Sequence, residues 1–106
     1  MIIDQGERFS VYTQGTAEAI ATQAAPGASR YIYVTDVAAS SDRAGTQVFI
    51  DNGTTTMFNL SLGSASNIPF SHNFHSPLRG NANTAVRVRV GSATSLSWAF
   101  IAGYIV

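Results

Sequence analysis

The feature that most constrains the fold is a repeated pattern of short strand-forming runs. Runs rich in Val, Ile, Thr, Phe and Tyr recur about every 8–12 residues, and clusters of Gly, Asn and Ser separate them. This spacing is typical of antiparallel sandwiches and barrels. Because no linker divides the 106 residues, we predict a single domain over residues 1–106, with residues 1–7 as an N-terminal extension.

Strand positions follow from local alternation and from the flanking turns. The alanine-rich segment 16–25 fits a helix or a strand, and we interpret it as a strand because it has no apolar stripe and would be marginal as a helix. Residues 75–83 are expected to form the longest loop. About eight antiparallel strands result, which predicts an all-β, jelly-roll-like β-sandwich. The predicted strands are residues 8–13, 16–25, 30–37, 46–51, 54–62, 68–74, 85–90 and 96–106.

The sequence Asp51-Asn52-Gly53 predicts a tight hairpin. Asn-Gly supplies the two positive φ angles of a type I′ turn. Phe49 lies on the otherwise polar face of the first arm, where a large aromatic side chain favours an interface. Met57 is expected next to it across the hairpin, so we assign both residues to a self-association surface.

The last predicted strand is apolar on both faces. Trp98, Phe100 and Tyr104 share one face, and Ile101 and Ile105 share the other. A solvated antiparallel strand is polar on one side, so the second face must be covered by a second sheet or by another subunit. We predict that Ile101 and Ile105 contribute to self-association.

Arg87 and Arg89 share one face of strand 85–90, opposite three valines. Their guanidinium groups, about 7 Å apart, repel each other unless other groups satisfy them. One interpretation is a solvated face with nearby carboxylates. The other is a docking patch for acidic groups on a neighbouring subunit.

Composition excludes several classes of protein. Only 11% of residues are charged, the net charge is zero, and all the basic side chains are arginines. We therefore expect no direct nucleic-acid binding. No apolar run approaches the roughly 18 residues of a membrane span, and the start of the chain lacks the pattern of a signal peptide, so we expect synthesis in the cytoplasm and no membrane contact. The absence of cysteine excludes disulfides and thiolate metal sites.

No constellation of residues indicates catalysis. His72 and His75, three apart in sequence, project to opposite faces of a strand and cannot share a metal ion there. We interpret His72 as a half-buried, hydrogen-bonded side chain. The six acidic residues are scattered, and no serine lies in a nucleophile elbow. We expect no enzyme activity, no metal and no cofactor.

A set of short segments carries a family resemblance. They are residues 25–36 (APGASRYIYVTD), 51–55 (DNGTT), 58–60 (FNL), 70–74 (FSHNF), 77–78 (PL), 83–86 (NTAV) and 102–104 (AGY). Together they resemble small tailed-bacteriophage virion proteins of jelly-roll type, over residues 17–106.

The resemblance implies a non-enzymatic structural protein on the outer surface of a phage head. Such short domains are commonly homotrimeric capsid decoration, or cement, proteins that bind the major capsid protein and stabilise the shell. In that role, the candidate docking residues are Arg87, Arg89, Ile2 and Ile3. The alternative is a receptor- or carbohydrate-binding module at a tail tip or fibre. For that role, the available side chains are Tyr12, His75 and Arg79.

Overall fold

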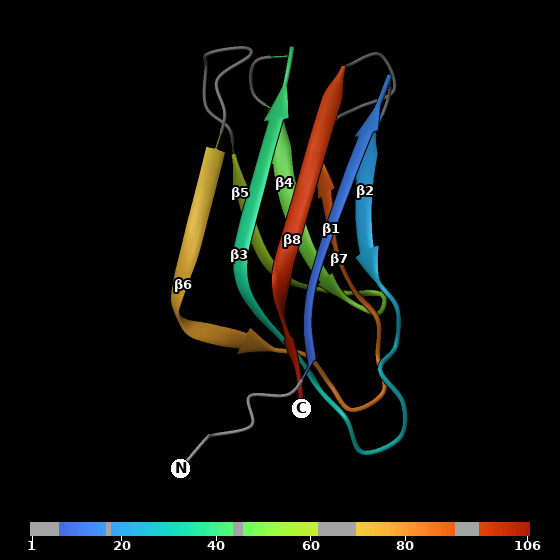
Figure 1. The fold of residues 1–106 in the computed structure, drawn as a ribbon. Coiled ribbons are helices and arrows are strands. Elements are labelled where there is room, and N and C mark those ends of the chain that lie inside the picture. Colours follow the sequence, from blue (N-terminus) through green and yellow to red (C-terminus); the bar gives the residue numbers. More distant parts are fainter. Residues whose placement is uncertain (1–6, 17, 44–45, 62–69, 91–95) are drawn as a thin grey trace.

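The computed structural model describes residues 7–16, 18–43, 46–61, 70–90 and 96–106. Within these ranges the chain forms two four-stranded antiparallel sheets (Figure 1). The described residues contain no helix that is long and apolar enough to cross a membrane. The strands are β1 (Glu7–Gly15), β2 (Ala19–Gln23), β3 (Ile32–Ser41), β4 (Gln47–Asn52), β5 (Thr55–Ser61), β6 (Phe70–Arg79), β7 (Val86–Val90) and β8 (Ser97–Ile105).

Strand pairing is nested from the ends of the chain inward. β1 pairs with β8, β2 with β7, β3 with β6, and β4 with β5. Further pairing of β3 with β8 and of β4 with β7 joins these pairs into sheets. Sheet I has the order β1-β8-β3-β6, and sheet II has the order β2-β7-β4-β5. This nested arrangement of eight strands is that of a jelly roll, so the predicted fold class is confirmed.

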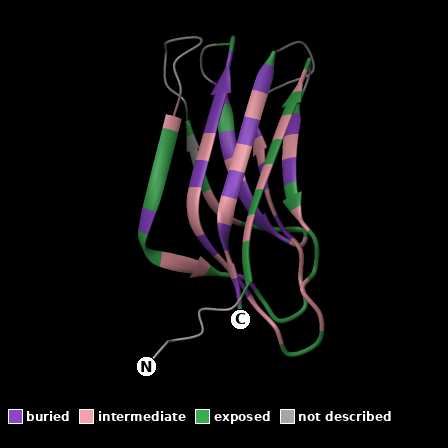
Figure 2. Ribbon diagram, in the orientation of Figure 1, coloured by how far each residue is buried: buried purple, intermediate pink, exposed green. Residues whose placement is uncertain are grey.

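Small branched side chains fill the space between the sheets. Val86, Val88 and Val90 of β7 are buried, and Arg87 and Arg89 face outward, as the alternation of this segment predicts. Buried positions likewise alternate along β8 (Figure 2). The core is therefore built mainly from valine, isoleucine and alanine, which fit the roughly 10 Å gap between packed sheets.

The predicted self-association role of Ile101 and Ile105 is wrong. These side chains are 0% and 3% exposed and belong to the core of the single chain. The second apolar face of β8 is covered by sheet II, so neither isoleucine is available to another subunit. The face with Trp98, Phe100 and Tyr104 points outward instead.

A bulge in β3 decides which of its residues face outward. Thr35 has no partner on β8, because the residues on either side of it pair with neighbouring β8 residues. After the bulge, Asp36 lies on the outer face and Val37 returns to the core. Gly103 allows the close approach of the two strands here, since a Cβ at this position would lie 1.9 Å from the carbonyl oxygen of Tyr33.

The hairpin between β4 and β5 forms, but with a different turn from the one predicted. Asn52 pairs with Thr55 across the ladder, so the turn residues are Gly53 and Thr54. Gly53 has a φ of 63°, whereas Asn52 and Thr54 have no positive φ. A glycine at the first central position is the pattern of a type II′ turn, not of type I′.

β6 is longer than the sequence predicts. It continues to Arg79, so the first part of the expected loop 75–83 is strand. Pro77 is tolerated because β6 is an edge strand of sheet I. Pairing with β3 breaks between Asn73 and Leu78, and the strand bends sharply (Figure 1). The start of the predicted strand, residues 68–69, lies outside the described residues.

Candidate functional site

Aromatic side chains gather on the outer face of sheet I. We call this group the aromatic band. Tyr12 is 59% exposed, and the other members are half-buried. The rings of Tyr33 and Tyr104 stack with centroids 5.0 Å apart, and those of Tyr12 and Trp98 lie 6.3 Å apart. The band consists of Tyr12 from β1, Trp98, Phe100 and Tyr104 from β8, and Tyr33 from β3.

The strand register places these rings in rows across the sheet. Tyr12 is paired with Phe100, and Tyr104 is paired with Tyr33. The row between these two aromatic pairs has no ring. It consists of Ser10, Ala102 and Asp36, with Ala102 of β8 in the middle. The outer face is therefore lower between the aromatic rows than along them.

A hollow of about 430 Å³ opens in this lower part of sheet I. Its lining includes the polar residues Asp36, Asn73 and His72, the ring of Phe100, and the smaller residues Val37, Ala38, Ser71 and Ala102. The lining thus combines a ring, a carboxylate and an amide on neighbouring strands of one sheet.

The carboxylate of Asp36 is held in place by neutral donors. The Asn73 side-chain amide donates to Oδ1 at 2.8 Å, and the Thr35 hydroxyl lies 2.9 Å from Oδ2. The carbonyl oxygen of Ala102 on β8 is a second, more distant acceptor for the same hydroxyl proton, at 3.3 Å. These contacts fix the orientation of the carboxylate at the edge of the hollow.

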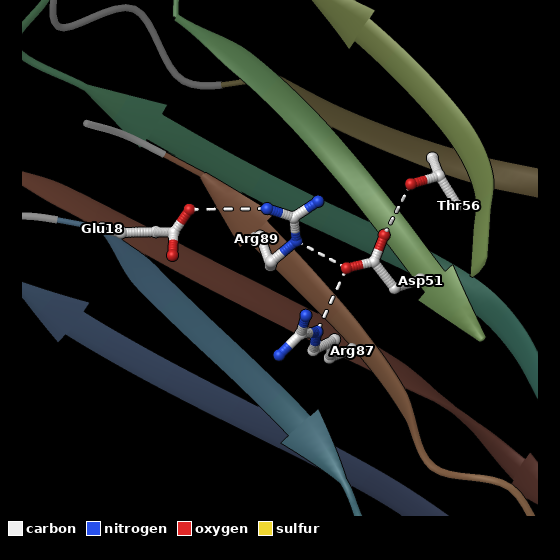
Figure 3. A network of polar contacts seen from close by, with 5 residues as sticks. All are labelled: Glu18, Asp51, Thr56, Arg87 and Arg89. Atoms are coloured by element: carbon white, nitrogen blue, oxygen red, sulfur yellow. Dashed lines mark hydrogen bonds and ion pairs between the residues drawn. The ribbon is translucent and has the colours of Figure 1, made fainter. Parts of the chain in front are cut away.

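The outer face of sheet II carries a network of charged side chains (Figure 3). The carboxylate of Asp51, only 2% exposed, lies at its centre. It accepts hydrogen bonds from Nε of Arg87 at 3.1 Å, from Nε of Arg89, and from the hydroxyl of Thr56 at 3.0 Å. Arg89 also contacts Glu18, with 3.6 Å between Nη1 and Oε2. The network extends across the whole outer face of sheet II, from Glu18, directly before β2, through β7 and β4 to Thr56 on β5.

Opposing effects set the pKa of Asp51. Burial of the carboxylate would by itself raise this pKa. Hydrogen bonds from Arg89, Thr56 and Arg87 stabilise the charged form and outweigh burial, so the pKa is lowered. The hydrogen bond to Asp51 correspondingly raises the pKa of Arg89. Asp51 therefore remains charged at neutral pH.

The structure supplies partners for the predicted docking arginines within the same chain. Arg87 and Arg89 both bind Asp51, which is the first of the two interpretations drawn from the sequence. Their docking role stays a prediction. The reason given for it, two guanidinium groups without a partner, no longer applies, because both are paired with Asp51. The other predicted docking residues, Ile2 and Ile3, lie outside the described residues.

The two remaining predicted interface residues have different surroundings. Phe49 is half-buried on the outer face of sheet II, where the guanidinium carbon of Arg89 lies 4.5 Å from the ring centroid. Met57 has no partner on β4 and forms a second bulge, and its side chain packs against the core. The residue paired with Phe49 is Asn59, so Met57 does not extend a patch around Phe49.

The side chains proposed for the receptor-binding alternative do not converge. Tyr12 lies on β1 and Arg79 on β6, at opposite edges of sheet I. The guanidinium of Arg79 lies over the ring of Tyr31, 4.9 Å from its centroid, and His75 is exposed. Among the residues described, no group of acidic or histidine side chains is arranged to hold a metal ion.

His72 is exposed rather than half-buried as predicted. Its ring lies beside the rings of Phe58, Phe70 and Phe74, with the closest centroid, that of Phe74, at 4.6 Å. The edge position of β6 explains this exposure, since no strand lies beyond it in sheet I.

Sequence reasoning missed the pairing of Asp36 with Asn73 and the outward direction of the aromatic band. The pairing depends on the bulge at Thr35, which no local pattern signals. The direction of the band has a signal in the sequence. Along β8, aromatic residues alternate with small or aliphatic residues. Only the small or aliphatic set resembles the valines of β7 in size, so this set is the one suited to the same core.

Comparisons with known proteins give only distant structural similarities. No protein family and no curated protein matches the sequence. The structure is similar to the insecticidal delta-endotoxin Cry8Ea1 from Bacillus thuringiensis, with a TM-score of 0.47 and 14% identity. That match covers 92% of this chain and 19% of the toxin, so the chain spans about a fifth of the toxin's length.

Two smaller proteins are also similar. One is the carbohydrate-binding module CBM36, in complex with calcium and xylotriose, with a TM-score of 0.42 and 16% identity. That match covers 92% of this chain and 76% of the module. The other is the mitogen derived from Yersinia pseudotuberculosis, with a TM-score of 0.41 and 8% identity. That match covers 92% of this chain and 83% of the mitogen.

Proposed function

We propose that the protein is a non-catalytic receptor-binding domain of a tailed-bacteriophage virion, and that the outer face of sheet I is its binding surface. The assignment to a virion rests on the family resemblance of the sequence. The observation that carries the binding role is the aromatic band, which crosses the sheet beside a hollow with hydrogen-bonding groups. Recognition surfaces of this kind combine broad apolar contact with a few placed polar groups.

The composition of this face favours a ligand with both polar and apolar parts. The outward residues of β1, β8 and β3 are aromatic, alanine or polar, and none is valine, leucine or isoleucine. Permanent subunit interfaces are more hydrophobic and resemble a divided core. Tyrosine and tryptophan, by contrast, offer an apolar ring with a polar group at its edge. The face therefore suits reversible binding better than permanent burial.

Binding to intact bacteria tests this proposal without assuming the chemistry of the receptor. The labelled full chain is expected to stain some strains in a panel of Gram-negative and Gram-positive cells. Tyr12→Ser, at the most exposed position of the band, is expected to weaken staining about tenfold, as loss of an aromatic contact that anchors a ligand does. Phe49→Leu, on the opposite sheet, is the control and should stain like wild type. Absence of staining on every strain, or equal staining by Tyr12→Ser, contradicts the proposal.

Capsid decoration is the second candidate function. The zero net charge and lysine-free composition of the chain favour association between copies. In this role a homotrimer binds the major capsid protein at several points at once and stabilises the shell by mass action. Sedimentation equilibrium provides the test. A trimer that also binds empty heads supports decoration, and a monomer at micromolar concentration contradicts it.

A further inference from the structure

We infer that the hollow beside Asp36 and Asn73 is a subsite for a neutral sugar ring. This inference rests on the proposed function, because it names the chemical class of the receptor that the outer face of sheet I binds. It adds a position on that face, a ligand class and roles for Asp36, Asn73 and Phe100.

The polar side of the hollow matches the hydroxyl groups of a sugar. A carboxylate has about four lone-pair positions. In Asp36, Asn73 and Thr35 each occupy one of them, on different oxygens. Each oxygen therefore retains an acceptor position for a ligand hydroxyl. Next to it, the carbonyl oxygen of the Asn73 amide adds another acceptor, and sugar hydroxyls can donate to both groups at once.

The carboxylate is held in position before a ligand arrives. The one hydroxyl proton of Thr35 is donated to Asp36, the nearer of its two acceptors, and Asn73 donates both to Asp36 and, at 3.4 Å, to the carbonyl oxygen of Thr35. Binding then requires little further ordering of side chains, which lowers its entropic cost. The bulge of β3 thus has a role beyond strand geometry, since it presents Asp36 in this fixed orientation.

The apolar side of the hollow matches the C–H face of a sugar. Phe100 forms an aromatic side, and Ala38 and Ala102 leave room next to it. The face of an aromatic ring is electronegative, and the C–H groups of a sugar ring are weakly electropositive, so the two surfaces attract. The volume of about 430 Å³ is within the usual range for small-ligand sites, roughly 300–1,000 Å³.

The charges around the hollow select against other ligands. Asp36 is the acidic residue in the lining, His72 is the other ionisable residue there, and the lining contains no arginine. An anionic ligand would therefore meet a carboxylate with no arginine beside it to offset the repulsion. A divalent cation would need several oxygen ligands, and the described residues hold no such cluster. A wholly apolar ligand would remove water from the carboxylate and offer it no further hydrogen bond.

Fluorescence titration of the full chain tests the inference directly, because Trp98 is the only tryptophan and belongs to the aromatic band. The probes are neutral oligosaccharides, namely α-glucan, β-glucan, mannan and galactan hexamers, with an oligogalacturonate as the anionic comparison. At least one neutral probe is expected to change the Trp98 emission in a saturable way. The anionic probe should bind at least about tenfold more weakly.

Matched variants locate the binding site. Asp36→Ala is expected to weaken binding of that probe at least about tenfold, since hydrogen bonds to a charged group are among the stronger ones. Phe100→Leu keeps an apolar side chain but removes the ring, and a loss of about tenfold is expected. Phe49→Leu is the same substitution on a half-buried phenylalanine of sheet II and should leave the affinity unchanged. If circular dichroism shows that Asp36→Ala is unfolded, Asp36→Asn, which keeps the shape of the side chain and removes its charge, replaces it.

The possible results separate this inference from the proposed function. Saturable binding that survives Asp36→Ala and Phe100→Leu overturns the sugar subsite, whereas the binding role of sheet I still stands if Tyr12→Ser reduces cell staining. No response to any neutral probe up to about 10 mM also overturns the subsite, and persistent cell staining then indicates a protein receptor. If staining is absent as well, both proposals fail.

Discussion

At the residue scale, Asp51 shows how a charge becomes tolerable in a sandwich with few charges. Its carboxylate is nearly inaccessible, yet three donors from β5 and β7 surround it. Both arginines remain partly exposed, with 39% and 25% of their side-chain surfaces accessible. The cost of burying the carboxylate is thus offset by several hydrogen bonds, whereas the arginines keep part of their hydration.

Asp51→Asn should reveal this balance. The variant keeps the shape of the side chain but leaves Arg87 and Arg89 without the carboxylate between them. We expect a loss of about 2 kcal/mol in the free energy of unfolding, less than for a fully buried pair because both arginines are partly hydrated. Urea unfolding at neutral pH measures this loss. Glu18→Gln is the control, since its exposed 3.6 Å ion pair should contribute less than about 0.5 kcal/mol. Equal losses in the two variants would contradict the central role of Asp51.

Acid should remove the same contribution in the wild-type protein. Because folding lowers the pKa of Asp51 below its ordinary value of 3.8, its ionised form stabilises the fold at pH values above that value. The contribution is lost as the pH falls through the lowered pKa. Urea unfolding from about pH 7 down to pH 2 should therefore show the difference between wild type and Asp51→Asn shrinking below about pH 4. A difference that stays constant over this range would rule out Asp51 as its source.

At the element scale, the close approach of β3 and β8 depends on Gly103. A Cβ there would lie 1.9 Å from the carbonyl oxygen of Tyr33 and 3.1 Å from the Cα of Val34. Both contacts are with backbone atoms, so rotation of a side chain cannot relieve them. The strands must separate, and the bulge that positions Asp36 must change with them.

Gly103→Ala should therefore destabilise the fold by about 3 kcal/mol or more, since overpacking of this severity requires backbone movement. Thermal unfolding followed by circular dichroism measures the effect. Ala102→Ser, the neighbouring outward position on β8, should change stability by less than about 1 kcal/mol. A Gly103→Ala variant as stable as Ala102→Ser would show that the strands are not tightly apposed.

Regular alternation made some elements predictable from sequence. The strict pattern of β7 predicted that Arg87 and Arg89 share an outer face, and turn residues located the β4–β5 hairpin. Breaks in alternation could not be predicted. At Thr35 and Met57 a bulge shifts by one residue which side chains of the strand face outward. Each bulge depends on how the strand pairs with its neighbour in the sheet, β8 for Thr35 and β4 for Met57.

The candidate site illustrates the same limit of sequence reasoning. Asp36 and Asn73 are far apart in the chain and meet only because β3 and β6 are neighbours in sheet I. For β8, local composition fitted burial of either face. Which face of β8 is buried depends on the space between the sheets. The side chain of Ile101 lies in that space, and the side chain of Trp98 lies on the outer face.

At the scale of the whole molecule, the nested strand order makes the core a property of the single chain. Ile101 lies on β8, in the middle of sheet I, and is fully buried without a second copy. Its contribution should therefore belong to folding and not to association between chains.

Ile101→Ala should lower the free energy of unfolding by about 3–4 kcal/mol, as expected for an aliphatic side chain replaced in a core. The loss should be the same at low and high protein concentration, because Ile101 is buried within the single chain. Ile20→Ala, at a half-buried outer position of sheet II, is the comparison and should cost about 1 kcal/mol. If the loss in the free energy of unfolding grows with protein concentration, Ile101 contributes to a subunit interface and this account is contradicted.

The two outer faces of the sandwich differ in kind. Sheet II presents arginines whose charges are matched within the chain, with the ring of Phe49 against Arg89. Sheet I presents the aromatic band and the hollow beside Asp36. The first face is therefore largely self-contained, and the second has rings and hydrogen-bonding groups available to a ligand.

Chemical-shift mapping is the most direct test of the central claim that sheet I is the binding surface. The ¹⁵N-labelled chain is titrated with the neutral oligosaccharide that changes the Trp98 emission most. We expect the perturbed amides to gather on β3, β6 and β8, around Asp36, Asn73 and Phe100. Perturbations that gather instead around Phe49 and Arg89 on sheet II, or none at saturating concentration, would contradict the claim.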